Sequence, residues 1–135
     1  MEISDNTLCE NIAAGTGDLY VSGSTTNCSV VRTIVAFSSS GDGILCGNGA
    51  TFSCCLVYGN AGSDYLCFGI DGGNNLFEDP QFCGITGSGI LTLQSDSPCV
   101  AANNICNPPI GALGMGCSTT DSEQGTWGGL KNRYE

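Results

Sequence analysis

Short apolar runs alternate with polar turn residues along the whole chain. Two of the runs, 34–37 (Ile-Val-Ala-Phe) and 56–58 (Leu-Val-Tyr), hold four residues or fewer and contain β-branched or aromatic side chains. Gly, Ser, Asn and Asp separate the runs, as is typical of strands joined by tight turns. No window carries the periodicity of a helix of normal length, so the pattern predicts an all-β chain.

The apolar runs repeat with a period of 22 residues. A fixed period of this size indicates a unit that stacks on copies of itself, because one unit alone cannot bury its apolar face. We therefore expect a parallel β-solenoid of about three to four coils. The aligned sets are Leu8, Val30 and Phe52; Ile12, Ile34 and Leu56; Ala13, Val35 and Val57; and Ala14, Ala36 and Tyr58.

One column of the repeat is polar. Thr16, Ser38 and Asn60 share a phase, and Asp42 aligns with Asp64. Side chains that lie above one another in stacked coils can form hydrogen bonds along the axis, so this column predicts a turn ladder. The alternative interpretation is a chance result of a composition rich in turn residues.

At 135 residues the chain is long enough for one domain only. We expect the solenoid coils and a C-terminal cap over residues 1–117, a polar, acidic linker over 118–125, and a short amphipathic tail over 126–135.

In the tail, Trp127, Leu130 and Tyr134 would share one face of a short helix, with Lys131 and Arg133 beside them. This tail could dock on the acidic solenoid or on an export or surface-anchoring partner; the alternative is a frayed end.

The charge balance narrows the possible partners. Thirteen acidic residues against three basic ones leave a net charge of −10, which repels a nucleic-acid backbone. Polyanionic polysaccharides are repelled too, unless metal cations bridge the two. No stretch approaches the roughly 18 apolar residues of a membrane span. We expect no nucleic-acid partner and no membrane span.

Ten cysteines and no histidine predict disulfides made in an oxidising compartment. A structural zinc site is the alternative, but the chain lacks the C-x-x-C pairs that such sites use. Cys46 and Cys67 are spaced to meet across adjacent coils, and Cys99 and Cys106 could close a short loop. The vicinal pair at 54–55 should point to opposite strand faces, and a structural role is preferred over redox chemistry.

Residues 1–6 have neither a basic region nor an apolar core, so they are not a secretory signal. We expect this chain to be the C-terminal end of a longer secreted or cell-surface protein, with its signal and further coils upstream. Those upstream coils are then its foremost partner.

Calcium is the one cofactor that the sequence suggests. Residues 59–67 nearly match the nonapeptide G-G-x-G-x-D-x-U-x, in which the aspartate, here Asp64, supplies oxygen to calcium. Such sites need adjacent copies to complete the coordination shell, and Asp42 is only a partial echo one coil away. A simple turn between strands explains the same residues.

Several segments together resemble the last coils of bacterial right-handed parallel β-helix repeat proteins of the pectin-lyase-like fold. The resemblance spans roughly residues 7–117. It implies three short parallel sheets around a narrow apolar core, and export to the periplasm, surface or medium. The segments that carry it are 34–38, 53–62, 79–83, 91–99 and 110–114.

The resemblance does not extend to catalytic residues. Related pectin-degrading hydrolases use Asn-Thr-Asp, Asp-Asp, Gly-His-Gly and Arg-Ile-Lys elements, and this chain has none of them. Related lyases need a basic residue, and Arg32 is the only one in the predicted solenoid. No spacing selects a carboxylate pair for hydrolysis from the candidates Asp64, Asp71, Glu78 and Asp79.

We therefore expect no catalytic residues within this chain. The sequence favours a non-catalytic exported module with a structural role and a surface or carbohydrate as its candidate contact. The alternative is the terminal part of a polysaccharide lyase or hydrolase whose active groove lies upstream.

Overall fold

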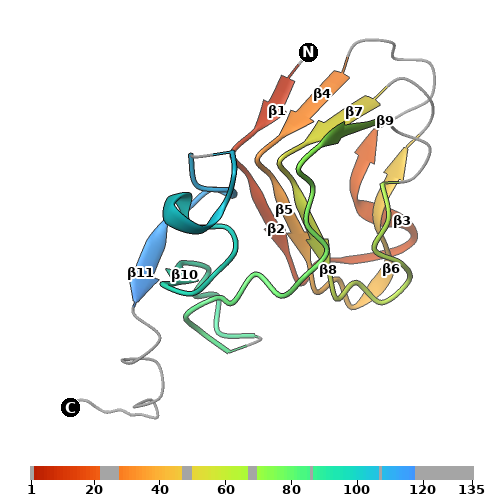
Figure 1. Cartoon of the computed structure of the whole chain (residues 1–135). Helices are drawn as coiled ribbons and strands as arrows, with labels where there is room; N and C mark the ends of the chain where they lie inside the picture. Colours follow the sequence, from red (N-terminus) through yellow and green to blue (C-terminus); the bar gives the residue numbers. More distant parts are fainter. Residues whose placement is uncertain are drawn as a thin grey trace.

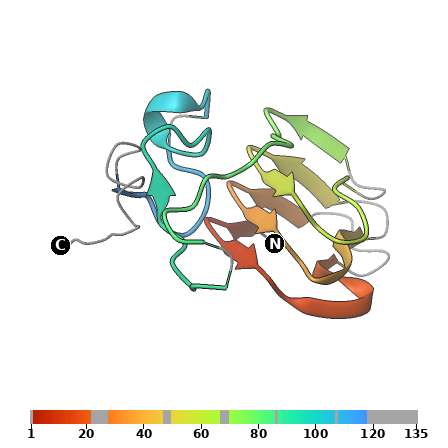
Figure 2. The ribbon, with the colours of Figure 1, turned by 90° about the horizontal axis from the view of Figure 1, so that it is seen from below.

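The chain forms a parallel β-solenoid of about four turns, which confirms the predicted fold class. A computed structural model describes residues 2–21, 28–46, 50–66, 70–85, 87–106 and 108–117. The coils lie as layers, one above the next, and a C-terminal segment lies beside them (Figure 1, Figure 2). The strands are β1 (Glu2–Ser4), β2 (Thr7–Cys9), β3 (Ile12–Val21), β4 (Cys28–Val31), β5 (Ile34–Ala36), β6 (Ser40–Cys46), β7 (Ala50–Ser53), β8 (Leu56–Tyr58), β9 (Ile70–Gly73), β10 (Leu93–Gln94) and β11 (Met115–Cys117).

Three parallel sheets make up the solenoid. Their strand orders are β1-β4-β7-β9, β2-β5-β8 and β3-β6. Because each coil contributes its strands in the same order, every sheet grows by one strand per turn. The only helix among the described residues is a single 3-10 turn, Ala101–Asn103. No described helix has the length and apolar character needed to cross a membrane.

The coils differ in length, so the predicted period holds for one pair of turns only. Val30 pairs with Phe52 and Ile34 with Leu56, at the expected spacing. Between the first and second coils, paired residues in the sheets β1-β4-β7-β9 and β2-β5-β8 are 27 positions apart in sequence, which is longer than the predicted period. Asp5 and Arg32 have the same separation. Between the third and fourth coils the offset is shorter, as in the pairing of Phe52 with Asp71. A single shift of the sequence against itself therefore finds the central pair of coils alone.

The first member of each predicted apolar column is consequently wrong. The predicted period aligns Leu8 with Val30, but in the structure Leu8 pairs with Val35. Ile12 pairs with Ser40, and its side chain is 80% exposed. The register then shifts within β3 before Gly17, over the stretch that holds Ala13, Ala14 and Thr16, whose side chains are outside the described part of the structure.

Ser38 and Asn60 of the predicted polar column are in contact, but the bond runs from the Ser38 backbone to the Asn60 side chain and not between the two side chains, because the Ser38 hydroxyl donates to the Gly41 carbonyl of its own coil. The Ser38 N–H donates to Asn60 Oδ1 (3.0 Å), and Asn60 Nδ2 donates to the Val35 carbonyl (3.1 Å). Asn75 repeats this arrangement one coil later, because it accepts from the Cys55 N–H (2.9 Å) and donates to the Phe52 carbonyl (2.9 Å). Each amide therefore links its own coil to the backbone of the preceding one.

Residues with positive φ bend the chain at two corners of each coil. The backbone N–H of most of these residues donates to a carbonyl of the next coil, as from Arg32 to Ser53 (3.1 Å) and from Phe37 to Tyr58 (3.1 Å). Hydrogen bonding between coils thus continues through the bends. The first corner holds Asp5, Arg32, Cys54 and Asn74, and the second holds Glu10, Phe37 and Gly59.

The sheet β2-β5-β8 is buried on both faces. Val35 and Val57 point into the solenoid core with Phe52. Ile34 and Leu56 point outward and pack against the C-terminal segment (residues 81–117). A sheet that is covered on both sides needs a continuous apolar run instead of alternation, which explains the sequences of β5 and β8. In contrast, β4 and β7 alternate between buried and half-buried residues, as expected for a sheet with one covered face.

The C-terminal segment lies along the flank of the solenoid, where it contacts three successive coils (Figure 1). The Ala112 N–H donates to Thr7 Oγ1 (2.9 Å) in the first coil, and the Gly111 N–H donates to the Arg32 carbonyl (2.8 Å) in the second. A disulfide joins Cys106 to Cys54 in the third. The segment therefore ties consecutive coils together from the side.

Candidate functional site

The second corner of the coils supplies one wall of a pocket. Glu10 and Phe37 occupy equivalent places in consecutive coils, with φ of 60° and 61°. Gly59 follows in the next coil with φ of 71°. A Cβ on Gly59 would lie 2.8 Å from the Phe37 ring, so the glycine both allows the bend and makes room for the ring. The corner thereby presents a carboxylate and an aromatic side chain toward the C-terminal segment.

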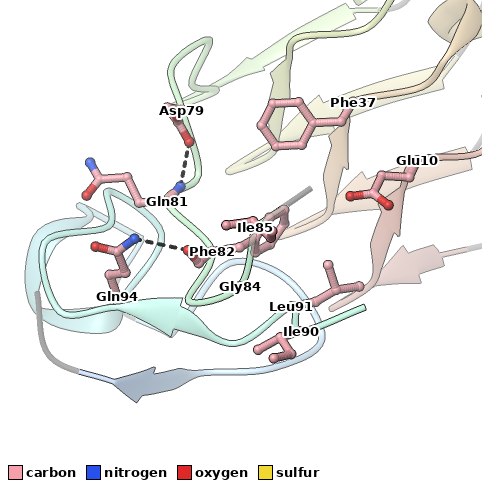
Figure 3. Close-up of a pocket in the computed structure, with 10 residues that line it drawn as sticks. All are labelled: Glu10, Phe37, Asp79, Gln81, Phe82, Gly84, Ile85, Ile90, Leu91 and Gln94. Carbon is pink, nitrogen blue, oxygen red and sulfur yellow. Dashed lines mark hydrogen bonds between the residues drawn. The ribbon is translucent and has the colours of Figure 1, made fainter. Parts of the chain in front are cut away.

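The pocket lies between this corner and the C-terminal segment and has a volume of about 320 Å³. Figure 3 shows Glu10 and Phe37 on the solenoid side of the pocket. They face Asp79, in the chain between β9 and the C-terminal segment, and residues of the C-terminal segment itself. This volume is at the small end of the range for ligand pockets. The lining residues are Glu10, Phe37, Asp79, Gln81, Phe82, Gly84, Ile85, Ile90, Leu91 and Gln94.

Aromatic and aliphatic side chains form the apolar part of the pocket. The Phe37 and Phe82 rings have centroids 6.2 Å apart and planes at 64°. Phe37 also meets Tyr58 edge to face, at 6.0 Å and 90°. These contacts hold the Phe37 ring from two sides. Ile85, by contrast, is 83% exposed at the rim.

Two carboxylates and two amides supply the polar groups of the pocket. Glu10 Oε2 accepts from the Gly87 N–H (2.8 Å), a contact between residues 77 positions apart. Asp79 Oδ1 accepts from the Gln81 N–H (2.8 Å), and Gln94 Nε2 donates to the Phe82 carbonyl (3.0 Å). No lining residue is basic. The pocket therefore offers hydrogen-bond acceptors, amide groups and negative charge beside apolar rings.

Asp64, the predicted calcium ligand, is engaged in a local turn. Its carboxylate accepts from the Gly59 N–H (2.8 Å), from the Asn60 N–H (2.9 Å) and from Asn60 Nδ2 (2.8 Å). Asp42 Oδ1 accepts from Ser63 Oγ (2.9 Å). No cluster of three or more Cys, Asp or Glu among the described residues is placed to hold a metal ion. Calcium at these two residues stays a prediction.

Two disulfides have both cysteines in the described part of the chain, Cys54–Cys106 and Cys83–Cys117. The predicted closure of the loop between Cys99 and Cys106 does not form, because Cys106 is bonded to Cys54 and Cys99 is a free, buried thiol. Cys46 is disulfide-bonded; Cys67, its predicted partner, lies outside the described residues.

The vicinal cysteines have different surroundings, as the alternation of strand faces predicts. Cys54 is bonded to Cys106, whereas Cys55 is a buried thiol inside the solenoid core. Burial raises the pKa of Cys55 and of Cys9, the latter to about 11. The pKa of Cys99 is raised to about 12, again by burial. The raised pKa values keep these three thiols protonated near neutral pH, and a protonated thiol is a poor nucleophile.

Sequence reasoning selected Asp79 among several acidic candidates but found no partner for it, and it missed Glu10 altogether. The structure places both in the lining of one pocket. The signal for Glu10 was weak, because its relation to Phe37 appears only when the longer offset between the first two coils is known. The fragment Gln81-Phe82 belonged to a segment of the family resemblance, but the resemblance assigned it no role.

Comparisons of the chain with protein-family models, with curated proteins and with solved structures find no match. The structure itself therefore carries the assignment to the β-solenoid class. The resemblance to bacterial proteins of pectin-lyase-like fold stays a prediction.

Proposed function

We propose that this protein is a non-catalytic β-solenoid module that binds one ring of a neutral carbohydrate in the pocket beside its second corner. The observation that carries the proposal is the side-chain composition of the pocket. Phe37 and Phe82 provide aromatic surface, against which the C–H face of a sugar ring can pack. Glu10 and Asp79, together with the pocket amides, can form hydrogen bonds with hydroxyl groups.

Charge supports a neutral sugar over an anionic one. The pocket lining contains two carboxylates and no basic side chain, and the whole chain has a net charge of −10. An anionic sugar would be repelled at the pocket and throughout its approach. The pocket volume of about 320 Å³ also suits one ring and not an extended chain.

Disulfides support export of the protein. Cys54–Cys106 ties the C-terminal segment, which forms one side of the pocket, to the coils, and Cys83–Cys117 closes a loop within that segment. Such bonds persist in oxidising compartments and are rare in the reducing cytosol. We therefore place the proposed module at a cell surface or in the external medium.

A further coil of backbone is the proposed partner at the edge formed by β1, β2 and β3. Among the described residues, these strands are paired on one side only. Ile3, Leu8 and Leu19 are only partly buried, although they belong to the same core as the fully buried residues of the next coil. An added coil would complete both the hydrogen bonding and the burial of this end.

A binding experiment tests the sugar proposal. A glycan array of neutral and anionic sugars selects a ligand, and calorimetry then measures its affinity for the parent and for Phe37→Leu and Glu10→Gln. We expect each change to weaken binding about tenfold, since each removes one well-placed contact of about 1.4 kcal/mol. Asp96→Asn, at an exposed carboxylate outside the pocket, is the matched control and should leave the affinity unchanged. Selection of anionic sugars alone would contradict the proposal.

The placement of two carboxylates in one pocket favours a glycoside hydrolase as the second candidate. Glycoside hydrolysis uses one carboxylic acid and one carboxylate on either side of the bond that is cleaved. Release of reducing sugar by the parent, with and without calcium, and its loss in Glu10→Gln and in Asp79→Asn would favour this candidate over the binding module.

A further inference from the structure

The pocket has an apolar rim that is open to solvent. Ile85 is 83% exposed and Ile90 is 52% exposed, and both lie in the loop of the C-terminal segment that lines the pocket (Figure 3). The Phe37 ring lines the same pocket from the solenoid side. Apolar side chains gathered at the surface of soluble proteins commonly mark a contact that is made with another group.

The charge of the pocket restricts what that group can be. Glu10 and Asp79 are both acidic, and the residues lining the pocket include no cation to balance them. A protein segment that combines apolar side chains with positive charge would complement this surface.

One segment of this chain has that composition. Residues 126–135 contain Trp127, Leu130 and Tyr134, spaced so that one helical face could carry all three, and also Lys131 and Arg133. Those two cations are two of only three basic residues in the chain. Glu135 is the one acidic residue of the segment, so two cations against one anion leave a net side-chain charge of +1. The composition therefore matches the pocket in apolar character and in the sign of its charge.

The structure also places Cys117, the last described residue before this segment, close to the pocket. β11 ends at Cys117, which is bonded to Cys83, and Cys83 directly precedes the pocket residue Gly84. Trp127 follows Cys117 by ten positions. Ten residues can span up to about 33 Å, and a random coil of that length spans about 18 Å on average. The tether is long enough to reach the pocket and short enough to hold the segment near it.

We infer that residues 126–135 occupy the pocket as an internal ligand, with Trp127 among the apolar side chains and the two cations beside Glu10 and Asp79. Occupancy by the tail excludes other ligands, so the tail regulates access; this regulatory part rests on the proposed sugar binding. A tether of ten residues can give an effective concentration of about 1 mM, so an intrinsic dissociation constant of about 0.1 mM would keep about 90% of the pockets filled. Removal of the tail would then raise the apparent affinity for sugar about tenfold.

The single tryptophan of the chain is a direct probe of the tail. In the full chain we expect Trp127 to emit at a shorter wavelength than in an isolated peptide of residues 126–135, and to be quenched less by acrylamide. Ile85→Ser should shift the emission toward that of the peptide. Ile105→Ser is the matched control, because Ile105 is 81% exposed in the same segment but lies outside the pocket lining; it should leave the emission unchanged. Since Ile85 and Ile105 are both exposed, neither substitution should unfold the protein.

A second pair of variants tests the charge contribution. Glu10→Gln with Asp79→Asn should increase the quenching of Trp127, whereas Glu2→Gln with Asp96→Asn, which removes the same net charge elsewhere, should not. Emission equal to that of the peptide, or an equal response to the pocket and control changes, would overturn the inference. So would a Trp127 signal that depends on protein concentration, because it would indicate docking between molecules.

Sugar affinity of a chain truncated after Gly125 separates the two proposals, and in that chain the Phe37→Leu and Glu10→Gln changes act on sugar binding alone, because no tail competes for the pocket. If the truncated chain binds no sugar while Trp127 is protected in the full chain, the sugar proposal fails and the internal ligand stands. If the truncated chain binds sugar with the affinity of the full chain, the regulatory role is refuted.

Discussion

Single residues hold successive coils in register. Asn60 uses both ends of its amide, accepting from the Ser38 N–H and donating to the Val35 carbonyl, and its side chain is buried. Gly43 leaves the space that this amide fills, because a Cβ there would lie 2.5 Å from Asn60 Nδ2. The buried amide thus adds a second link between the coils beside the backbone hydrogen bond from Phe37 to Tyr58 at the same bend.

Asn60→Ala should therefore destabilise the protein strongly. The change leaves the buried Ser38 N–H without its partner and removes one donor from the Val35 carbonyl, at a cost of about 1–3 kcal/mol in the free energy of unfolding. Asn75→Ala, which removes the same pair of contacts at a less buried site, should cost less. Chemical denaturation of the two variants measures the difference, and equal losses would show that burial does not determine the contribution of this amide.

The buried thiol of Cys99 should make stability fall at alkaline pH. Its pKa is raised from 9.0 to about 12, chiefly because burial disfavours the thiolate, although a hydrogen bond from Ser97 opposes this effect. Above pH 9 the thiol of the unfolded chain loses its proton while that of the folded chain keeps it, so the unfolded state is favoured as pH rises toward 12. The contribution is fully present below pH 9 and is lost above it.

Unfolding free energies measured from about pH 8 to about 10.5 test this dependence. The parent should lose stability with a slope that approaches about 1.4 kcal/mol per pH unit for each such thiol. Cys99→Ala should show a shallower slope. Identical slopes in the two proteins would rule out Cys99 as a source of the alkaline loss.

In the sheet β2-β5-β8, the position of a strand in the stack determines how much its side chains contribute to the free energy of unfolding. Leu56 in β8 is fully buried between the solenoid and the C-terminal segment, whereas Leu8 in β2 is only partly buried at the open edge of the stack. Both are leucines on the same sheet, Leu56 on its outer face and Leu8 on its inner face, so the pair compares a fully buried leucine with a partly buried one.

Leu56→Ala should cost about 2–5 kcal/mol because it removes buried surface and leaves a cavity. Leu8→Ala should cost clearly less, since its side chain already meets solvent and the site can relax. Denaturant midpoints measure both values. A larger loss for Leu8→Ala would show that the first coil is covered in solution, for example by the added coil that we propose as a partner.

The whole molecule consists of a stack of coils with a C-terminal segment along its flank. Cys54–Cys106 joins the two parts, while Cys83–Cys117 lies within the C-terminal segment. The first bond closes a sequence separation of 52 residues and the second one of 34. The entropy that each bond removes from the unfolded chain corresponds to a stabilisation of about 4 kcal/mol. The two bonds should therefore contribute similarly to stability, but they should affect the shape of the pocket differently.

Replacement of Cys54 and Cys106 by serine should lower the free energy of unfolding by about 2–4 kcal/mol and weaken ligand binding, because the segment that completes the pocket loses its covalent tie. The matched double serine variant of Cys83 and Cys117 should lose similar stability but keep the tie to the coils. Thermal unfolding and calorimetric binding of the two variants make the comparison. Equal effects on binding would indicate that the tie to the coils does not shape the pocket.

The sequence by itself determined the fold class and the central register of this protein. Repeated β-branched runs and turn residues identify a solenoid, because both are local signals and each coil repeats them. The pairing of Ile34 with Leu56 and the contact of Ser38 with Asn60 followed from the same repeat.

Only the tertiary structure decided the lengths of the outer coils, the disulfide partners and the pocket. A coil can gain residues in its turns without losing its sheet contacts, so the sequence period cannot specify the longer offset between the first two coils. The pocket depends on contacts such as that of Glu10 with Gly87, 77 positions apart. Such contacts arise from the path that the C-terminal segment takes along the flank, and no local pattern of residues encodes that path.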